Sequence, residues 1–141
     1  MSIIENLSEL SLQYFALVRQ LSSKFELTLS QTLVLLSIPF DGVTISDLSE
    51  KLGIDISTMT RNIQRIEKKK LVKRLPNPND KRSIKLFLSQ RGSILINSIN
   101  LEISVSLDKI LDKYDLKISN QIKNNLENLS WDIYLHRQNL K

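Results

Sequence analysis

The sequence predicts a mainly α-helical fold with one small β-hairpin. Hydrophobic residues make up 41% of the 141 residues, which is enough to form a core. Only 3 glycines and 3 prolines are present, far fewer than a turn-rich sheet protein of this size would use. Apolar residues recur at helical spacing along most of the chain. The length suits a single domain.

The first expected helix begins near Ile3. Its apolar residues alternate steps of four and three, which places them on one stripe of a helix. They are Ile3, Leu7, Leu10, Tyr14, Leu17 and Leu21. A second helix is expected at about residues 30–38, because Pro39 prevents its continuation. Asp41 and Gly42 then form a turn.

Two short helices separated by a glycine are expected next. Thr44 is a polar cap with an acid, Asp47, three residues later, which is close to a capping box. Gly53 suits the left-handed position that ends a helix, and Asp55 can cap the helix expected at about residues 56–69. The apolar residues of this last helix are Ile56, Met59, Ile63 and Ile66. The arrangement predicts a helix-turn-helix.

A β-hairpin is expected after these helices. Residues 71–75 and 84–88 alternate partly between apolar and charged side chains, and residues 76–80 between them are turn-forming. Ser89 can cap a long helix, and a last helix is expected from about Lys117. The apolar residues with helical spacing in these two helices are Ile96, Ile99, Ile103, Leu107 and Ile110, then Ile118, Ile122, Leu126, Leu129 and Ile133.

Positive charge is concentrated around the second short helix and the hairpin. Residues 56–91 contain eleven Lys and Arg residues but only two acidic residues, Glu67 and Asp80. Because the whole chain has a net charge of only +5, the remainder is net negative. A basic surface on a helix-turn-helix and a hairpin favours a nucleic-acid partner.

One side of the helix expected at residues 56–69 is polar and basic. Short hydroxyl and amide side chains on such a helix can reach bases and phosphates, and arginine can bind guanine or phosphate. The candidate DNA contacts are Ser57, Thr58, Thr60, Arg61, Asn62, Gln64, Arg65 and Lys68. An ordinary solvated helix face is the alternative interpretation.

The hairpin is also basic. Its candidate DNA contacts are Arg74, Asp80, Lys81, Arg82 and Lys85. An acid two residues before an arginine can orient the guanidinium, so we expect Asp80 to orient Arg82. A protruding arginine suits a narrow, electronegative minor groove. The alternative is a surface ion pair of little energetic value.

The composition argues against several other functions. The absence of cysteine excludes disulfides, thiolate metal sites and thiol-based redox sensing. His136 is the only histidine, and the carboxylates show no ligand spacing. Because no phosphate-binding glycine loop and no nucleophile beside a base is visible, we expect neither enzymatic activity nor a cofactor. The N-terminus lacks the pattern of a targeting sequence, and residues 33–40 form too short an apolar run to span a bilayer, so we expect a cytoplasmic protein without a membrane partner.

Four segments together resemble the MarR family of winged helix-turn-helix transcription regulators. Residues 57–63, 67–74, 80–83 and 86–92 look like the recognition helix, the wing and the start of the following helix of that family. The most specific part is Asp80-x-Arg82 followed by the Leu-x-Leu-Ser-x-x-Gly run that ends at Gly92. The resemblance covers roughly residues 27–92, and the flanks match in layout only.

Three positions depart from the family pattern. Lys70 stands where the family usually has glycine, so either the recognition helix ends differently or a left-handed lysine is tolerated. Ile66 replaces a usual leucine, and Ser89 replaces a usual threonine. These two changes keep the apolar and the capping role, respectively.

The resemblance implies one integrated domain, with a DNA-binding lobe at residues 27–92 and dimerisation helices at residues 1–26 and 93–141. It implies a homodimer that places two recognition helices in successive major grooves of a pseudo-palindromic operator, most typically as a repressor. The expected dimer contacts are Ile3, Leu7, Leu10, Tyr14, Ile122, Leu126, Leu129 and Ile133.

The resemblance also implies release from DNA by a small aromatic effector. The candidate pocket residues are Tyr14, Phe15, Tyr114 and Trp131, although aromatic residues on helices more often belong to a core. The alternative function is a winged-helix module that binds protein or serves an architectural role without sequence-specific readout of DNA.

Overall fold

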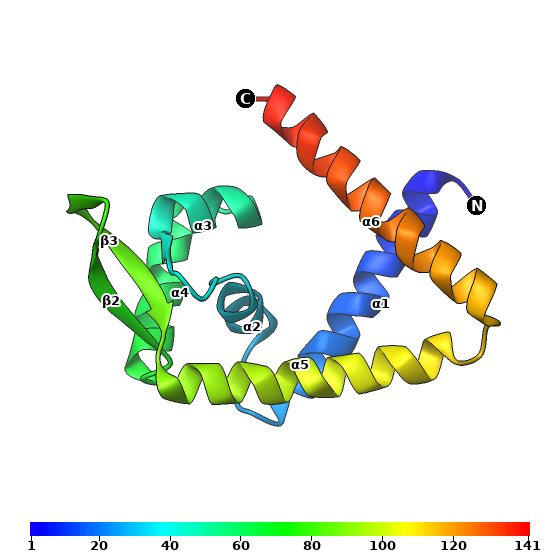
Figure 1. Ribbon diagram of the computed structural model, residues 1–141, viewed down its shortest axis with the longest axis horizontal. Coiled ribbons are helices and arrows are strands. Elements are labelled where there is room, and N and C mark those ends of the chain that lie inside the picture. Colours follow the sequence, from blue (N-terminus) through cyan, green and yellow to red (C-terminus); the bar gives the residue numbers. More distant parts are fainter. The chain divides into compact units, whose positions relative to one another are not determined.

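The computed structural model describes residues 1–141 as two compact units, residues 1–103 and residues 104–141. The elements of the first unit are α1 (Ile3–Ser23), α2 (Leu29–Leu36), β1 (Val43–Thr44), α3 (Ile45–Leu52), α4 (Ile56–Lys68), β2 (Val72–Asn77) and β3 (Asp80–Leu88). Helix α5 (Gln90–Leu111) begins in the first unit and ends in the second, which also contains α6 (Leu116–Asn139) (Figure 1). The predicted fold class is confirmed. None of the helices combines the length and apolar character that a bilayer span requires.

Polar caps begin the two helices of the helix-turn-helix, as the sequence predicts. The hydroxyl of Thr44 accepts a hydrogen bond from the backbone N–H of Asp47 at 3.1 Å. The carboxylate of Asp55 accepts one from the backbone N–H of Thr58 at 2.9 Å. Each bond satisfies an N–H that has no partner within its helix. Gly53 ends α3 in the left-handed conformation, with a φ of 66°.

Full capping boxes begin α1 and α2, which the spacing of apolar residues did not reveal. Ser2 and Glu5 exchange side-chain-to-backbone hydrogen bonds at the start of α1, and Thr28 and Gln31 do so at the start of α2. Helix α2 therefore spans Leu29–Leu36, slightly earlier than the expected residues 30–38. Its early end follows from Pro39, because the residue before a proline avoids the helical region.

The three strands form one antiparallel sheet in the order β1-β3-β2. Strands β2 and β3 form the predicted hairpin, but only Pro78 and Asn79 remain in its turn, so the strands extend further than expected. Strand β1 was not predicted, and it pairs Val43 with Leu86 of β3. It ties the chain that enters the helix-turn-helix to the hairpin.

The core of the first unit is mainly aliphatic. Its largest fully buried apolar side chains are Val18, Val34, Leu35, Leu48, Met59, Ile63, Ile66, Leu71, Leu86 and Ile99. Three of the four apolar positions predicted for α4 are among them. Ile56, the fourth, is the first residue of α4 and is 56% exposed.

The end of α4 is tightly joined to the start of α5. Lys70 adopts the left-handed conformation with a φ of 59°, so the strain of a non-glycine residue, about 1 kcal/mol, is tolerated. The hydroxyl of Ser89 donates to the carbonyl of Lys70 at 2.8 Å and accepts from the N–H of Gly92 at 2.9 Å. A Cβ atom on Gly92 would lie 2.0 Å from the carbonyl oxygen of Leu71. Only glycine fits at this approach.

Candidate nucleic-acid interface

Helix α4 presents one polar and basic side to solvent, opposite the side that enters the core. The exposed residues of this side are Ser57, Arg61, Gln64, Arg65 and Lys68. Thr58 and Thr60 are partly buried beside them. Most of the side chains predicted to contact DNA from α4 are therefore accessible on one continuous helix surface, as the periodicity indicated.

A chain of hydrogen bonds organises the first turns of α4. The carboxylate of Asp55 accepts from the hydroxyl of Thr58 at 2.7 Å as well as from its backbone N–H. The side-chain hydrogen bond from Thr58, followed by the backbone one, lowers the pKa of Asp55 below its ordinary value. The same hydroxyl accepts from the guanidinium of Arg61 at 3.5 Å. Because the Thr58 proton points to Asp55, this hydroxyl positions Arg61 and is not a free donor.

Asn62 does not belong to the exposed side of α4. Its side chain is only 8% exposed, and its amide donates a hydrogen bond to the hydroxyl of Ser30 at 2.9 Å. A step of about 100° from Arg61 turns this side chain toward α2. This corrects the prediction that Asn62 contacts DNA, because its amide links α4 to α2 instead.

The tip of the hairpin carries exposed cations. Lys81 and Arg82 are exposed in β3, directly after the two-residue turn. The carboxylate of Asp80 accepts from the backbone N–H of Arg82 at 3.0 Å and not from its guanidinium. The expectation that Asp80 orients the Arg82 side chain is thus corrected, because Asp80 shapes the backbone of the turn. The guanidinium of Arg82 is left without an intramolecular partner.

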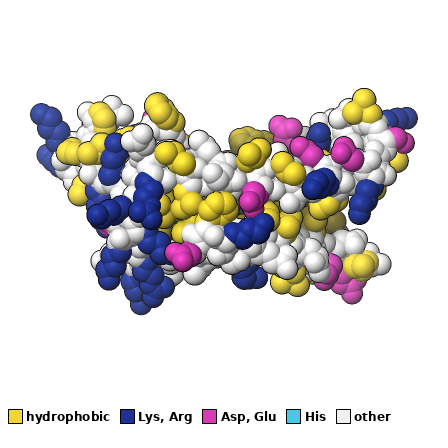
Figure 2. Space-filling model, turned by 90° about the horizontal axis from the view of Figure 1, so that it is seen from below, with side chains coloured by type: hydrophobic (Ala, Val, Ile, Leu, Met, Phe, Trp, Pro, Cys, Tyr) yellow, Lys and Arg dark blue, Asp and Glu magenta, His cyan; other side chains and the backbone are white.

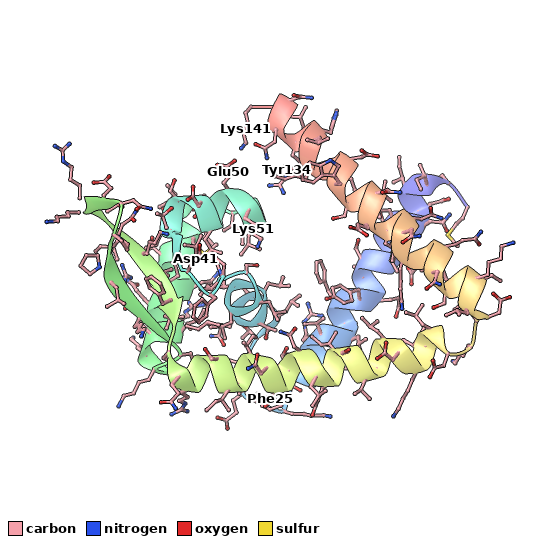
Figure 3. All side chains as sticks on the ribbon, viewed as in Figure 1. Phe25, Asp41, Glu50, Lys51, Tyr134 and Lys141 are labelled. Atoms are coloured by element: carbon pink, nitrogen blue, oxygen red, sulfur yellow. The ribbon has the colours of Figure 1, made fainter.

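Two other cations of the hairpin have partners within the protein. Both Nε and Nη2 of Arg74 donate to one carboxylate oxygen of Glu67, at 3.0 and 2.7 Å. This ion pair is partly buried and joins β2 to the end of α4. Lys85 donates weakly, at 3.4 Å, to the backbone carbonyl of Asp41, which is labelled in Figure 3. Arg74 in particular is less available for DNA than the sequence indicated.

Lys and Arg side chains gather at the end of the first unit where α4 and the hairpin lie (Figure 2). Acidic side chains are few in this part of the view. The clustering places the positive charge of residues 56–91 on one surface, which can follow the phosphate backbone of a nucleic acid.

Comparisons with known proteins agree on one family. The MarR family matches residues 27–84. The chain is 32% identical over 98 residues to multiple antibiotic resistance protein MarR of Escherichia coli (strain K12), covering 69% of this chain and 68% of the relative. It is 31% identical over 108 residues to the HTH-type transcriptional regulator SarZ of Staphylococcus aureus (strain USA300), covering 74% and 70%, respectively.

Solved structures share the fold. The crystal structure of apo MarR from E. coli superposes with a TM-score of 0.78 at 23% identity, covering 92% of this chain and 96% of that one. A mutant of E. coli MarR complexed with operator DNA superposes with a TM-score of 0.72 at 24% identity, covering 89% and 91%.

Proposed function

Because the chain belongs to the MarR family, we propose that it is a sequence-specific, double-stranded-DNA-binding transcription regulator that acts as a homodimer. Helix α4 would enter a major groove, and the β2-β3 hairpin would contact the adjacent minor groove. The observation that carries the proposal is the exposed basic side of α4 next to a hairpin tip with an unpaired Arg82. The relative SarZ is named a transcriptional regulator, and we propose no catalytic role and no cofactor for this chain. Because genomic DNA is the proposed site of action, we also propose a cytoplasmic location.

We propose different roles for the side chains of α4 and for those of the hairpin tip. Arg61, held by Thr58, lies where side chains can reach base edges, and Gln64 and Arg65 extend the same surface. Lys81 and Arg82 at the hairpin tip are suited to phosphates and the minor groove, where electrostatics dominates. The exposed carboxylate of Asp80 and the paired side chains of Arg74 and Lys85 act on DNA only indirectly in this proposal.

The dimer is supported by apolar side chains that the described structure leaves exposed. On α1, Ile3 is 69% exposed, and Leu10 and Tyr14 are also exposed, while Leu7 is partly buried. Helix α6 exposes three of its predicted contacts and partly exposes the fourth. These four are Leu126, Leu129, Ile133 and Ile122. Apolar surface of this extent needs a covering partner, so we propose residues 1–26 and 93–141 as dimerisation segments around the lobe of residues 27–92.

A small aromatic effector remains part of the proposal. Tyr14 and Phe15 pack their rings 5.9 Å apart on α1, and Trp131 stacks on Tyr134 at 5.2 Å on α6. Tyr114 is exposed. Because Trp131 is the only tryptophan, titration with small aromatic acids can be followed directly by its fluorescence. Unchanged fluorescence and unchanged DNA affinity across a panel of such acids would argue against an aromatic effector.

Selection of bound sequences from a random duplex library tests the central proposal. The intact chain should enrich an inverted repeat whose half-sites are centred about 10 base pairs apart, because a two-fold dimer reads two half-sites one helical turn apart. Competition by bulk DNA at fixed salt should leave binding to the selected site intact. Binding without any enrichment would favour the architectural alternative, and no binding to duplex DNA would contradict both functions.

A further inference from the structure

The β2-β3 hairpin ends in a tip that is held together by its own hydrogen bonds. The amide of Asn77 donates to the hydroxyl of Ser83 at 2.9 Å, and that hydroxyl donates to the backbone carbonyl of Asp80 at 3.3 Å. The carboxylate of Asp80 accepts from the backbone N–H of Arg82. These bonds lie where the register between the two strands shifts, next to Pro76. The tip that carries Arg82 is therefore fixed internally.

This tip projects beyond the part of the hairpin that packs on the core (Figure 1). Alternate residues of β2 share one face, and burial falls along it, because Val72 is buried, Arg74 is partly buried and Pro76 is exposed. On β3, Leu86 is fully buried, whereas Ile84, the partner of Pro76, is 50% exposed. Packing on the core thus ends at the level of Arg74 and its partner Leu86. A strand rises about 3.3 Å per residue, so the end of β2 lies about 10 Å beyond this level.

One ion pair joins the hairpin to α4 at this level. Arg74 donates from Nε at 3.0 Å and from Nη2 at 2.7 Å to the same carboxylate oxygen of Glu67. The two side chains are only 32% and 33% exposed, so water screens them less than it screens a pair on the open surface. Two donors on one acceptor also fix the direction of the guanidinium better than a single bond would. The pair therefore restrains β2 against the last turn of α4.

The geometric effect of this pair should exceed its effect on stability. A partly exposed ion pair contributes little to the free energy of unfolding. The tip, however, lies about 10 Å further out and follows any rotation of the base of the hairpin. A displacement of about 1 Å is enough to break a hydrogen bond to a base or a phosphate. Contacts made by the tip are therefore sensitive to the angle at which the hairpin leaves α4.

We propose that Glu67 and Arg74 are positioning residues. Their ion pair sets the angle between the hairpin and α4, so that Arg82 reaches the minor groove while α4 occupies the adjacent major groove. Neither Glu67 nor Arg74 needs to touch DNA. The effect on DNA rests on the proposed function, whereas the restraint of the hairpin does not. One consequence opposes simple electrostatics, because a negative charge beside the basic surface strengthens specific binding.

Glu67→Gln and Arg74→Gln test this role against direct contact of Arg74 with DNA. Each variant should lower the ratio of operator affinity to random-duplex affinity by about threefold to tenfold, as measured by fluorescence anisotropy. If Arg74 instead contacts phosphate, Glu67→Gln frees that cation and should strengthen binding to both DNAs, while Arg74→Gln should weaken binding to both. That result would overturn the proposal, as would unchanged ratios in both variants.

Two further variants separate the ion pair from the charge of Arg74. Arg74→Lys should keep more of the operator preference than Arg74→Gln, because an ammonium can still donate to Glu67. Lys73→Gln is the matched control, since Lys73 is an exposed cation on the opposite face of the same strand. It removes the same charge and should leave the ratio of the two affinities unchanged. An equal loss of this ratio in Lys73→Gln and Arg74→Gln would overturn the proposal.

A double-mutant cycle identifies which contact depends on the pair. Arg82→Ala should weaken operator binding less in the Glu67→Gln background than in the wild type, because Arg82 is no longer held in place. Arg61→Ala should weaken it by the same factor in both backgrounds, because α4 itself remains folded. Additive effects of Glu67→Gln and Arg82→Ala would overturn the proposal. General misfolding would instead reduce the effect of Arg61→Ala as well, and this too would count against a positioning role.

Spin labels test the restraint without DNA, since the chain contains no cysteine of its own. Labels are attached through Gln64→Cys on α4 and Lys81→Cys at the tip. Pulsed electron paramagnetic resonance should give one narrow distance distribution, and adding Glu67→Gln or Arg74→Gln should broaden or shift it. Identical distributions would overturn the proposal even if DNA binding had changed. A broadened distribution in a chain that enriches no DNA sequence would contradict the proposed function and leave the restraint standing.

Discussion

Hydrogen bonds of individual side chains decide which residues of α4 are free to contact DNA. The sequence places Thr58, Arg61 and Asn62 on or near one polar sector, but it cannot show what each donates to. In the structure, the amide of Asn62 donates to the hydroxyl of Ser30, and the hydroxyl of Thr58 donates to the carboxylate of Asp55. Arg61 is left with one weak internal hydrogen bond and an exposed guanidinium. It is the strongest candidate for reading a base.

Substituting Arg61 and Arg82 separately should distinguish base readout from electrostatic attraction. Arg61→Ala should weaken the free energy of binding to the selected operator by about 1–3 kcal/mol, because a base contact is lost, and should weaken binding to random DNA much less. Arg82→Ala should weaken binding to both DNAs by similar factors, and it should reduce the salt dependence of the affinity by about one phosphate contact. Fluorescence anisotropy on both DNAs at several salt concentrations measures these effects. Full affinity of both folded variants would rule out the proposed docking.

The lowered pKa of Asp55 predicts a pH dependence of stability. A carboxylate with a depressed folded-state pKa stabilises the protein above its unfolded pKa, and this contribution is lost as the pH falls through the folded pKa. Asp55→Asn keeps a good helix cap but cannot titrate. Urea unfolding between pH 7 and about pH 3 should therefore show a smaller acid-induced loss of stability in the variant than in the wild type. Parallel curves would contradict this role of Asp55.

Among the secondary structure elements, those with strong local signals were predicted well and those that depend on distant pairing were not. Caps and helical spacing are local, so the sequence revealed the helix-turn-helix down to Gly53 and the hairpin. Strand β1 has only two residues, too few to show alternation, and its partner Leu86 lies far along the chain. The ion pair between Glu67 and Arg74 bridges a helix and a strand, so no periodicity could indicate it.

The junction of α4, β2 and α5 depends on the absence of a side chain at Gly92. A methyl group there would collide with a backbone carbonyl, and backbone cannot move aside as cheaply as a flexible side chain. Gly92→Ala should therefore destabilise the protein by about 1–3 kcal/mol despite the higher helix propensity of alanine. Asn97→Ala, at an exposed position of α5, should change stability by less than about 0.5 kcal/mol. Equal urea midpoints for the two variants would show that the junction relaxes.

At the scale of the whole molecule, charge and apolar surface are divided along the sequence. Residues 56–91 carry the positive charge, whereas α1 and α6 carry exposed apolar side chains. Both distributions could be predicted, because net charge and helical periodicity are properties of the sequence itself. What covers the apolar surface could not be deduced from one chain, since the partner is a second copy in the proposal.

Disrupting the apolar side of α6 should therefore separate dimerisation from DNA contact. Sedimentation at micromolar concentration should show twice the 16.3 kDa mass of one chain for the wild type. Leu126→Glu combined with Leu129→Glu should shift it toward monomer, because buried unpaired carboxylates are costly at an interface. Lys123→Glu changes charge at an exposed position of the same helix and is the matched control.

The same variants connect assembly to recognition. A monomer engages only one half-site, so it loses the gain in affinity that comes from linking two recognition helices. The Leu126→Glu, Leu129→Glu variant should thus bind the inverted repeat no more tightly than a single half-site, while the control keeps its preference for the full repeat. A wild-type chain that sediments only at 16.3 kDa would contradict the dimer. A monomeric variant that still prefers the full repeat would show that recognition does not depend on these contacts of α6.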